Sequence, residues 1–329
     1  MNLYASVTGI SNIDTININT THDSSTTTAV VSCGSHSLTI GDAVTIDMGY
    51  STSHGVLFTG YVKQIDRQVP NDLWTIQLND VMIQAIDYFV AATDPNAPLT
   101  YQNITAETLV GNLMALAGLT NYTYEATSFT FGVNDKFEIN QVAVHDYCRT
   151  ISDLLTWNLW ADGSGQVHFE NRKPYVMLGT SGQPGDTVAD VPNGITITDS
   201  DILSISYMKD TQKLRNRIVV YGNQGVFAEA KVSSPYLPVG FYKTAVLAAP
   251  GLIDTNAIAQ TTADYNLVLL NRLTEAVSLE IVGNHNFAAR TVTTLNSTKM
   301  GLSTGNWYVF ACQHNHSSAG FITGLELRR

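Results

Sequence analysis

Short segments in which apolar and polar residues alternate dominate both ends of this 329-residue chain. In "AVTIDM", Val44, Ile46 and Met48 share one parity, with Thr45 and Asp47 on the other, and "LWTIQLNDVM" follows the same pattern. Successive side chains of a β-strand point to opposite faces, so a period of two indicates strands with one buried face. Turn-forming residues separate these segments. The chain is therefore predicted to be mainly β.

The two ends also contain stretches that resemble each other. "GDAVTIDMGYSTSHGVLFTGYV" (41–62) and "GNWYVFACQHNHSSAGFITGLE" (305–326) align without a gap and share Gly41/Gly305, Ser53/Ser317, Thr59/Thr323 and Gly60/Gly324. Each stretch is typical of a β-hairpin, because two apolar runs flank a polar segment. We therefore expect two similar tube-like β-barrels, one over residues 1–95 and the other over residues 193–329.

The region between them has a different pattern. The proline-containing segment "ATDPNAPLTYQN" indicates an exit from the first barrel. Apolar spacing predicts helices over 105–119, with Leu109, Leu113 and Leu116 on the buried stripe, and over 142–158, and a hairpin follows in "LWADGSGQVHFENR". Residues 96–192 are therefore predicted to form a small α+β domain. A further helix over 254–273 is expected to pack on the second barrel.

Composition narrows the class of protein. Apolar residues make up 44% and charged residues 14% of the chain, which is typical of a folded globular protein. The net charge of −11 is unevenly distributed along the chain. Residues 1–100 contain two basic and nine acidic residues, residues 101–190 contain four basic and ten acidic residues, and residues 191–329 contain eleven basic and nine acidic residues. Such a chain is a poor general binder of nucleic acid. No transmembrane helix or secretory signal is predicted.

The sequence carries no clear catalytic signature. Cys33, Cys148 and Cys312 are too scattered for a disulfide framework or metal knuckle, and each is expected to be a buried apolar residue. His145 and Asp146 lie near Cys148 on a predicted helix, but the cysteine belongs to the apolar stripe, which favours a structural role. No nucleotide-binding or other cofactor motif is present in the sequence, so no cofactor is expected.

Other candidates are also open to a structural interpretation. Glu125 and Glu138 could be drawn as a glycosidase pair, although nothing distinguishes them from other carboxylates. "DGSGQ" (162–166) is predicted to be a turn. Trp157 and Trp160 could serve a carbohydrate-binding module, yet their placement favours the core.

Two clusters are candidates for binding. His314 and His316 would face the same side of a strand, and His54 lies in the loop that the alignment makes equivalent, so the three are weak candidates for a metal site. A polar hairpin loop is the favoured alternative. The basic cluster Lys209, Lys213, Arg215 and Arg217 could meet the acidic first barrel of a neighbouring subunit, or could be a solvated strand end.

Three stretches, in the same order along the chain, resemble the baseplate-hub (tail-hub) proteins of tailed bacteriophages. They are "HGVLFTGYVKQIDRQ"; "TAETLVGNLMALAGLTNYTYE" with "VHDYCRTISDLLTWNLWADGSGQVHFENRKPY"; and "GNWYVFACQHNHSSAGFITGLELR". In that family they correspond to a strand pair of the first barrel, to two helices with a hairpin, and to the closing hairpin of the second barrel.

The resemblance implies a non-enzymatic homotrimer at the distal tail end of a virion, assembled in the host cytoplasm. Three chains with two barrels each would form a pseudo-sixfold ring between a sixfold tail tube and a threefold fibre or spike. Implied partners are a tail tube or distal tail protein, a central fibre or spike, and a tape measure protein. Genomic DNA would pass through the lumen without specific binding, and no membrane insertion is expected. We expect acidic and small polar side chains to line that lumen, and no fused fibre, spike or lysin domain.

Two alternatives remain open. One is a tail-associated hydrolase of the cell wall or of polysaccharide. The other is the trimeric base of a contractile injection or type VI secretion spike, although the sequence contains no β-helix repeat.

Overall fold

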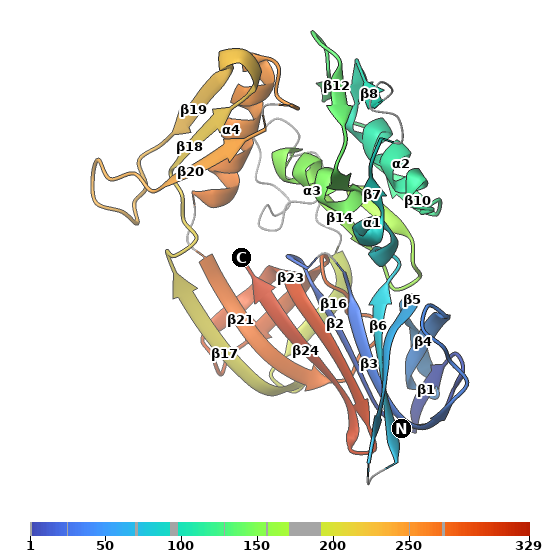
Figure 1. Ribbon diagram of the computed structural model, residues 1–329. Helices are drawn as coiled ribbons and strands as arrows, with labels where there is room; N and C mark the ends of the chain where they lie inside the picture. The colour runs from blue at the N-terminus through green and yellow to red at the C-terminus, as the bar shows by residue number, and fades with distance from the viewer. Residues whose placement is uncertain are drawn as a thin grey trace.

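The computed structural model describes residues 2–24, 26–69, 72–92, 98–127, 129–155, 157–170, 192–249, 251–271 and 274–329. Figure 1 shows two layers, a large curved sheet below and a mixed layer of helices and small sheets above. No helix in these ranges is long and apolar enough to cross a membrane. The predicted domain boundaries at 95/96 and 192/193 stay predictions, because 93–97 and 171–191 lie outside the described ranges.

The first barrel contains β1 (Leu3–Val7), β2 (Ile10–Thr21), β3 (Thr28–His36), β4 (Ala43–Tyr50), β5 (Ser53–Gln68) and β6 (Leu73–Asp80). These strands lie in the order β1-β4-β5-β6-β3-β2, and β1 returns to lie beside β2. The predicted alternation is confirmed, because Val44, Ile46 and Met48 are buried and pack with Ile76 and Leu78 of β6.

The second barrel repeats this order. It contains β16 (Pro192–Thr198), β17 (Ile202–Asp210), β21 (Thr274–Val282), β22 (Val292–Ser297), β23 (Leu302–Ser317) and β24 (Gly320–Arg328), arranged β16-β22-β23-β24-β21-β17. If the six strands of each barrel are numbered 1 to 6 in chain order, both barrels have the spatial order 1-4-5-6-3-2. One detail differs, since β1 pairs antiparallel with β4 whereas β16 pairs parallel with β22. Each barrel has its own core, so the prediction of two similar barrels is confirmed.

The two hairpins that align in sequence are, however, not equivalent parts of the barrels. The β4–β5 hairpin turns at Ser51 and Thr52, and strand order makes β22–β23 its counterpart. The aligned β23–β24 hairpin turns at Ser318 and Ala319, three positions later than the alignment requires, and corresponds to β5–β6. Hairpins share turn residues and alternating strands for local physical reasons, so their sequences can match without structural equivalence.

The α+β unit of the upper layer follows the first barrel. It contains α1 (Ile83–Asp87), β7 (Phe89–Val90), β8 (Leu99–Tyr101), β9 (Ile104–Thr105), α2 (Ala106–Leu116), β10 (Tyr122–Tyr124), β11 (Thr130–Phe131), β12 (Phe137–Ile139), β13 (Val142–Ala143), α3 (Val144–Leu155), β14 (Asn158–Ala161) and β15 (Val167–Glu170). The helix α2 ends before Gly118, which adopts a φ of +83°, a left-handed conformation that glycine tolerates without strain.

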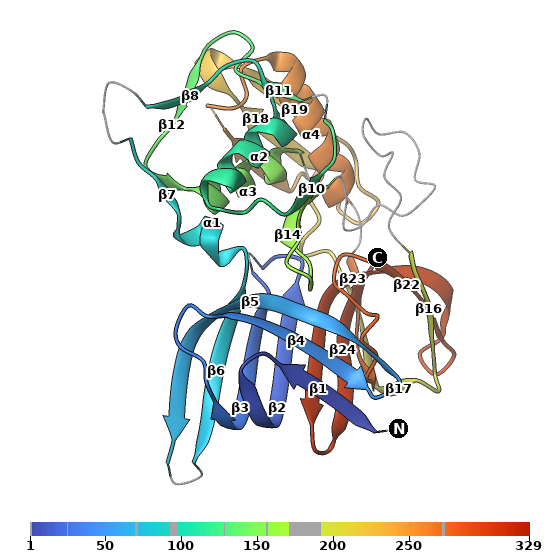
Figure 2. The same ribbon diagram turned by 90° about the vertical axis from the view of Figure 1, so that its right-hand side faces the viewer.

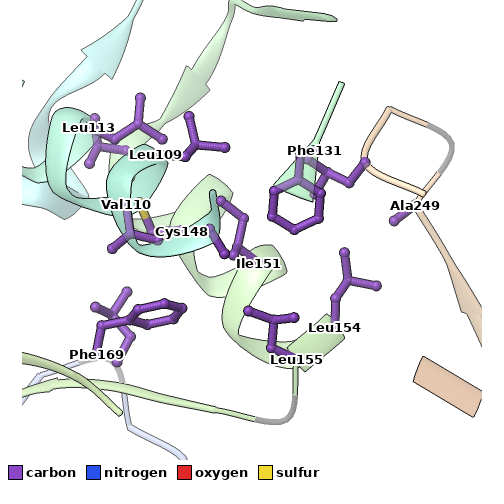
Figure 3. Packing of buried hydrophobic residues seen from close by; sticks show 14 of the residues in the cluster. Leu109, Val110, Leu113, Phe131, Cys148, Ile151, Leu154, Leu155, Phe169 and Ala249 are labelled. Atoms are coloured by element: carbon purple, nitrogen blue, oxygen red, sulfur yellow. The ribbon is translucent and has the colours of Figure 1, made fainter. Parts of the chain in front are cut away.

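The core of this unit lies between α2 and α3 (Figure 3). Leu109 and Leu113 of α2 are buried with Ile151 and Leu155 of α3, as the apolar spacing predicted. Leu116, which was predicted to share the stripe, is instead exposed. Val110 and Met114 are buried in its place, so the buried face of α2 is rotated from the predicted one.

A second unit of the upper layer is inserted between β17 and β21. It contains β18 (Arg217–Tyr221), the 3₁₀ turn η1 (Asn223–Gly225), β19 (Phe227–Lys231), β20 (Thr244–Ala248) and α4 (Asn256–Leu270). The Thr255 hydroxyl caps α4 by accepting a hydrogen bond from the Ile258 N–H at 3.3 Å. The helix packs on β18 and β19 and shares the upper core, rather than packing on the barrel as predicted. Its sequence shows an apolar stripe but not which surface covers it.

Candidate functional site

The two barrels are joined edge to edge into one continuous sheet. Strand β2 pairs antiparallel with β23, from Thr15 opposite Ser317 to Thr21 opposite Ala311. The Asn17 side-chain amide also donates a hydrogen bond to the Asn315 side-chain oxygen across this joint. Strand pairing satisfies backbone groups that an edge strand would leave open. The joint therefore shows that two barrels of this type can be joined by antiparallel pairing of one strand from each.

The counterparts of these two joined strands remain open. By strand order, β17 corresponds to β2, and β5 corresponds to β23. Within the described residues β17 pairs only with β21, and none of its nine residues is buried. Likewise, β5 pairs with β4 up to about Tyr61, but from Lys63 to Arg67 the same edge has no strand partner in the described ranges. We call these two stretches the free β17 edge and the free β5 edge.

The surface of the shared sheet that faces away from the barrel cores is lined by small polar side chains. We call it the polar sheet face, and it comprises Ser204, Ser206, Ser278, Glu280, Glu326, Gln313, Asn315, Asn17, Asn19, Thr28, Ser32, Thr75 and Gln77. These residues run from β17 through the joint to β6 and carry two carboxylates. Arg328, which lies on the same side of β24, pairs with Glu326. A hollow of about 430 Å³ lies on it between β17 and β2. The alternation predicts polar residues on one side of each strand, but only the joint makes them one surface.

The hairpin β14–β15 ties the upper layer to the first barrel. Its predicted turn is confirmed, since the Asp162 carboxylate accepts hydrogen bonds from the N–H groups of Ser164 and Gln166 at 2.9 and 3.0 Å. The Thr59 hydroxyl of β5 donates to the Gly163 carbonyl at 2.8 Å. A Cβ atom at Gly163 would lie 2.9 Å from the Leu57 backbone, so this contact requires glycine.

An ion cluster that the sequence did not predict stabilises the same hairpin. The two ring nitrogens of His168 contact Asp162 at 3.0 Å and Glu170 at 2.8 Å, and the imidazole stacks on Trp160. Burial by itself lowers the pKa of His168, but the hydrogen bonds to both carboxylates outweigh it and raise the pKa to about 9. With both N–H groups engaged, the imidazolium has no lone pair to act as a general base. The cluster is structural.

A cavity of about 180 Å³ lies where the two barrels meet this hairpin. Asp80 lines it, and burial raises the pKa of this carboxyl to about 7, against the opposing effect of hydrogen bonds from the Thr27 and Met82 N–H groups. His314 also lines it, and burial lowers the pKa of its imidazole to about 4. That imidazole contacts the Phe287 carbonyl at 3.1 Å.

The three histidines considered for metal binding do not form a group of ligands. His314 and His316 lie on the same side of β23, as their spacing predicted, but His54 contacts Asp47 at 2.9 Å in the first barrel. The described residues contain no group of three or more His, Cys, Asp or Glu side chains suited to hold a metal ion.

The residues considered for catalysis are placed in structural surroundings. Cys148 is fully buried in the α3 core, and burial raises the pKa of its thiol, which keeps it protonated. Burial also lowers the pKa of His145. Glu138 lies on β12, whereas Glu125 follows β10 on a separate sheet. Cys33 and Cys312 are likewise buried.

The two tryptophans considered for carbohydrate binding are partly buried. Trp157 packs against Phe169 with ring centroids 4.9 Å apart, and Trp160 stacks on His168 at 4.5 Å. Neither ring is therefore presented as an open stacking platform.

The basic cluster at the end of β17 contacts groups of its own chain. Lys209 pairs with Glu275 at 2.7 Å, and Arg217 pairs with Glu229 at 3.2 Å. The Lys213 ammonium lies 5.5 Å from the centroid of the Phe310 ring. Arg215 donates hydrogen bonds to the carbonyls of Gln212 and Leu214. A role for these four residues between subunits stays a prediction.

No protein-family model matches this sequence, and no curated protein matches it. Solved structures do match over nearly the whole chain. The 43 kDa tail protein of prophage MuSo2 from Shewanella oneidensis has a TM-score of 0.72 and 11% identity, covering 99% of this chain and 98% of that one. The tail protein from Neisseria meningitidis MC58 has a TM-score of 0.72 and 12% identity, covering 100% and 97%.

The chain has the fold of phage tail proteins. The resemblance read from the sequence is thereby confirmed at the level of fold. An E. coli component of the type VI secretion system is also similar, with a TM-score of 0.59, 5% identity, and coverage of 98% of this chain and 76% of that one. That protein is itself described as structurally similar to phage T4 tail proteins.

Proposed function

We propose that this chain is a structural hub protein of a phage tail, and that three copies form a ring of six barrels at the distal end of the tail tube. The ring would present six similar barrels to a sixfold tube and three identical subunits to a threefold fibre or spike. Its work is geometric, and no chemical reaction is required of it.

One observation carries this proposal: the chain makes a barrel-to-barrel joint once, and the matching edges have no strand partner among the described residues. Within the chain, β2 pairs with the second half of β23. Their counterparts are the free β17 edge and the free β5 edge. If β17 of one copy pairs with β5 of the next, the internal joint is repeated between copies. Two alternating joints of the same kind close a ring by heterologous contacts, and closure leaves no open sheet edge.

The polar sheet face fits the inner wall of such a ring. It runs across the internal joint and carries Glu280 and Glu326 among small neutral side chains. Carboxylates repel the phosphates of DNA, and the pairing of Arg328 with Glu326 leaves the charge of Glu280 uncompensated within this row, so non-specific affinity for DNA is low. A double helix would therefore pass this wall without being held.

Three further parts of the proposal concern partners and location. One rim would meet a tail tube or distal tail protein, and the other a central fibre or spike. A tape measure protein and the genome would occupy the lumen in turn. The protein would lie in the virion after assembly in the host cytoplasm.

The oligomeric state of the purified protein tests the proposal. Mass photometry is expected to show a species at three times the chain mass of 35.8 kDa, and negative-stain images are expected to show rings with a sixfold outline. A protein that stays monomeric at its highest soluble concentration would overturn the ring.

Hydrogen exchange tests the proposed joint separately. Compared with diluted monomer, the assembled protein is expected to show slower amide exchange in peptides covering Ser204–Asp210 and Lys63–Arg67. Peptides covering the joined strand β2 are the matched control and are expected to be protected in both states. Assembly without protection of either free edge would place the contact elsewhere.

A second candidate is the trimeric base of a contractile injection or type VI secretion spike. The fold similarity to the E. coli type VI component favours it. Immunogold labelling of purified particles separates the two: a label at the tail tip of DNA-filled phage supports the hub, whereas a label confined to particles without genomes supports the spike base.

A further inference from the structure

We infer that the outer face of the β18–β20 sheet is a second contact surface of the ring, where it binds the upper layer of a neighbouring copy of this chain. This inference rests on the proposed ring. It adds an apolar interface in the upper layer to the strand pairing of the lower layer.

One face of the β18–β20 sheet is more exposed than the other, although Val219 at its centre is buried. Ile218 and Val220 point to the α4 side and are fully buried. The opposite side presents Tyr221, Phe227 and Val246, which are 46–61% exposed, and we call these three residues the aromatic face. The Tyr221 and Phe227 rings lie 5.4 Å apart. Adjacent exposed aromatic residues on a rigid sheet are typical of an interaction surface.

The β18–β20 sheet, which carries the aromatic face, lies on the same side of the molecule as the free β17 edge. Figure 1 shows β18–β20 directly above β17 at the left of the molecule, with the loop 232–243 extending to the same side. This loop adds exposed Tyr236, Phe241 and Tyr242. A neighbour that pairs with β17 would therefore also stand against the upper layer at this side.

The opposite side of the upper layer carries a matching patch. Tyr88 and Phe89, at the junction of α1 and β7, are 42% and 57% exposed. The segment that carries them, from α1 to β7, lies above the first barrel and across the upper layer from β18–β20 (Figures 1 and 2). In a heterologous ring, one side of each copy must complement the other side of the next. The side with β17 and the aromatic face would meet the side with β5 and the Tyr88–Phe89 patch.

Charge favours the same pairing. The aromatic face is bordered by Arg217 and Lys231, which share the single carboxylate of Glu229 and leave a net positive charge. The Tyr88–Phe89 patch is bordered by exposed Asp87. Opposite charges at the rim of an apolar contact select the partner and its orientation more than they add affinity.

Engineered disulfides test this inference directly. The double variant Phe89→Cys with Phe227→Cys is expected to form covalent trimers on mild oxidation of the assembled protein. The three native cysteines are buried, so the background is low. The matched control is Val69→Cys with Phe227→Cys, because Val69 is 84% exposed but directly follows β5 in the lower layer. It is expected to stay uncrosslinked.

A second measurement tests the same interface without depending on the geometry of a disulfide. Phe227→Ser is expected to weaken assembly about tenfold or more, as loss of an exposed aromatic anchor does in other interfaces. Val133→Ser, at an equally exposed position between β11 and β12, is expected to leave assembly unchanged. If the wild-type protein forms rings but neither the crosslink nor the weakening is seen, the aromatic face is not an interface and the ring stands. If the wild-type protein forms no ring, the proposed function fails first, and this inference fails with it.

Discussion

Replacement of His168 by Gln is expected to remove a pH-dependent part of the stability of the β14–β15 hairpin. In the wild-type protein the imidazolium lies between Asp162 and Glu170, at 3.0 and 2.8 Å. The pKa of His168 is raised to about 9 in the folded chain. A raised pKa means that the folded state holds the proton more tightly, so the contribution is complete below about pH 6.5 and is lost as the pH rises through about 9.

The size of the effect follows from this pKa. The difference between 6.5 and about 9 corresponds to about 3 kcal/mol, at about 1.4 kcal/mol for each pH unit. The His168 side chain is 13% exposed, and Asp162 reaches solvent further, so screening reduces the value to about 2 kcal/mol. The wild-type protein is therefore expected to be more stable than His168→Gln by about 2 kcal/mol at pH 6, and by much less at pH 9.5.

Urea unfolding followed by tryptophan fluorescence measures this difference, because Trp157 and Trp160 lie at the same hairpin. Asp80, with a pKa of about 7, titrates in both proteins, so the difference between them isolates His168. A gap between wild type and variant that stays constant or widens from pH 6 to pH 9.5 would refute the assignment of a charged, doubly bound imidazole.

Two further predictions concern the contacts that position the two upper units. Gly163→Ala is expected to lower the free energy of unfolding by about 1–3 kcal/mol, because the new Cβ would lie 2.9 Å from the Leu57 backbone. A Cβ added at Gly251 would meet no atom within 4 Å, so Gly251→Ala is the control and is expected to be neutral in the same urea titration. Asn216→Ala is expected to speed proteolytic cleavage within the loop 232–243, because its buried amide bonds the backbone at both ends of that loop; unchanged cleavage under limited trypsin or chymotrypsin digestion would contradict this anchoring role.

Much of the fold could be read from local patterns. Alternation identified β4 and β6, since Val44, Ile46 and Leu78 are all buried on the predicted side. Helical spacing identified α2, α3 and α4, although each is shorter than predicted at one or both ends. The short strands β7 to β13 have at most three residues each, and such segments are too brief for a periodic signal to develop.

The candidate site could not be read in the same way. Sequence comparison paired the β4–β5 hairpin with β23–β24, yet strand order pairs it with β22–β23. The His168 cluster was missed because His168, which contacts Glu170 on its own strand, meets Asp162 only when the hairpin closes. A His-x-Glu pair following a Gly-rich turn with a leading Asp was the available signal, and it is a weak one.

The sequence by itself determined most of the residues that face a core, because burial of apolar side chains depends on residue type and on the period of the strand or helix. It thereby set the elements, the two β regions and the mixed region between them. Only the tertiary structure decided which strands are neighbours. Strand pairing is made by backbone N–H and C=O groups that every residue but proline carries, so side-chain identity says little about the joint between β2 and β23 or about the edges left open at β17 and β5.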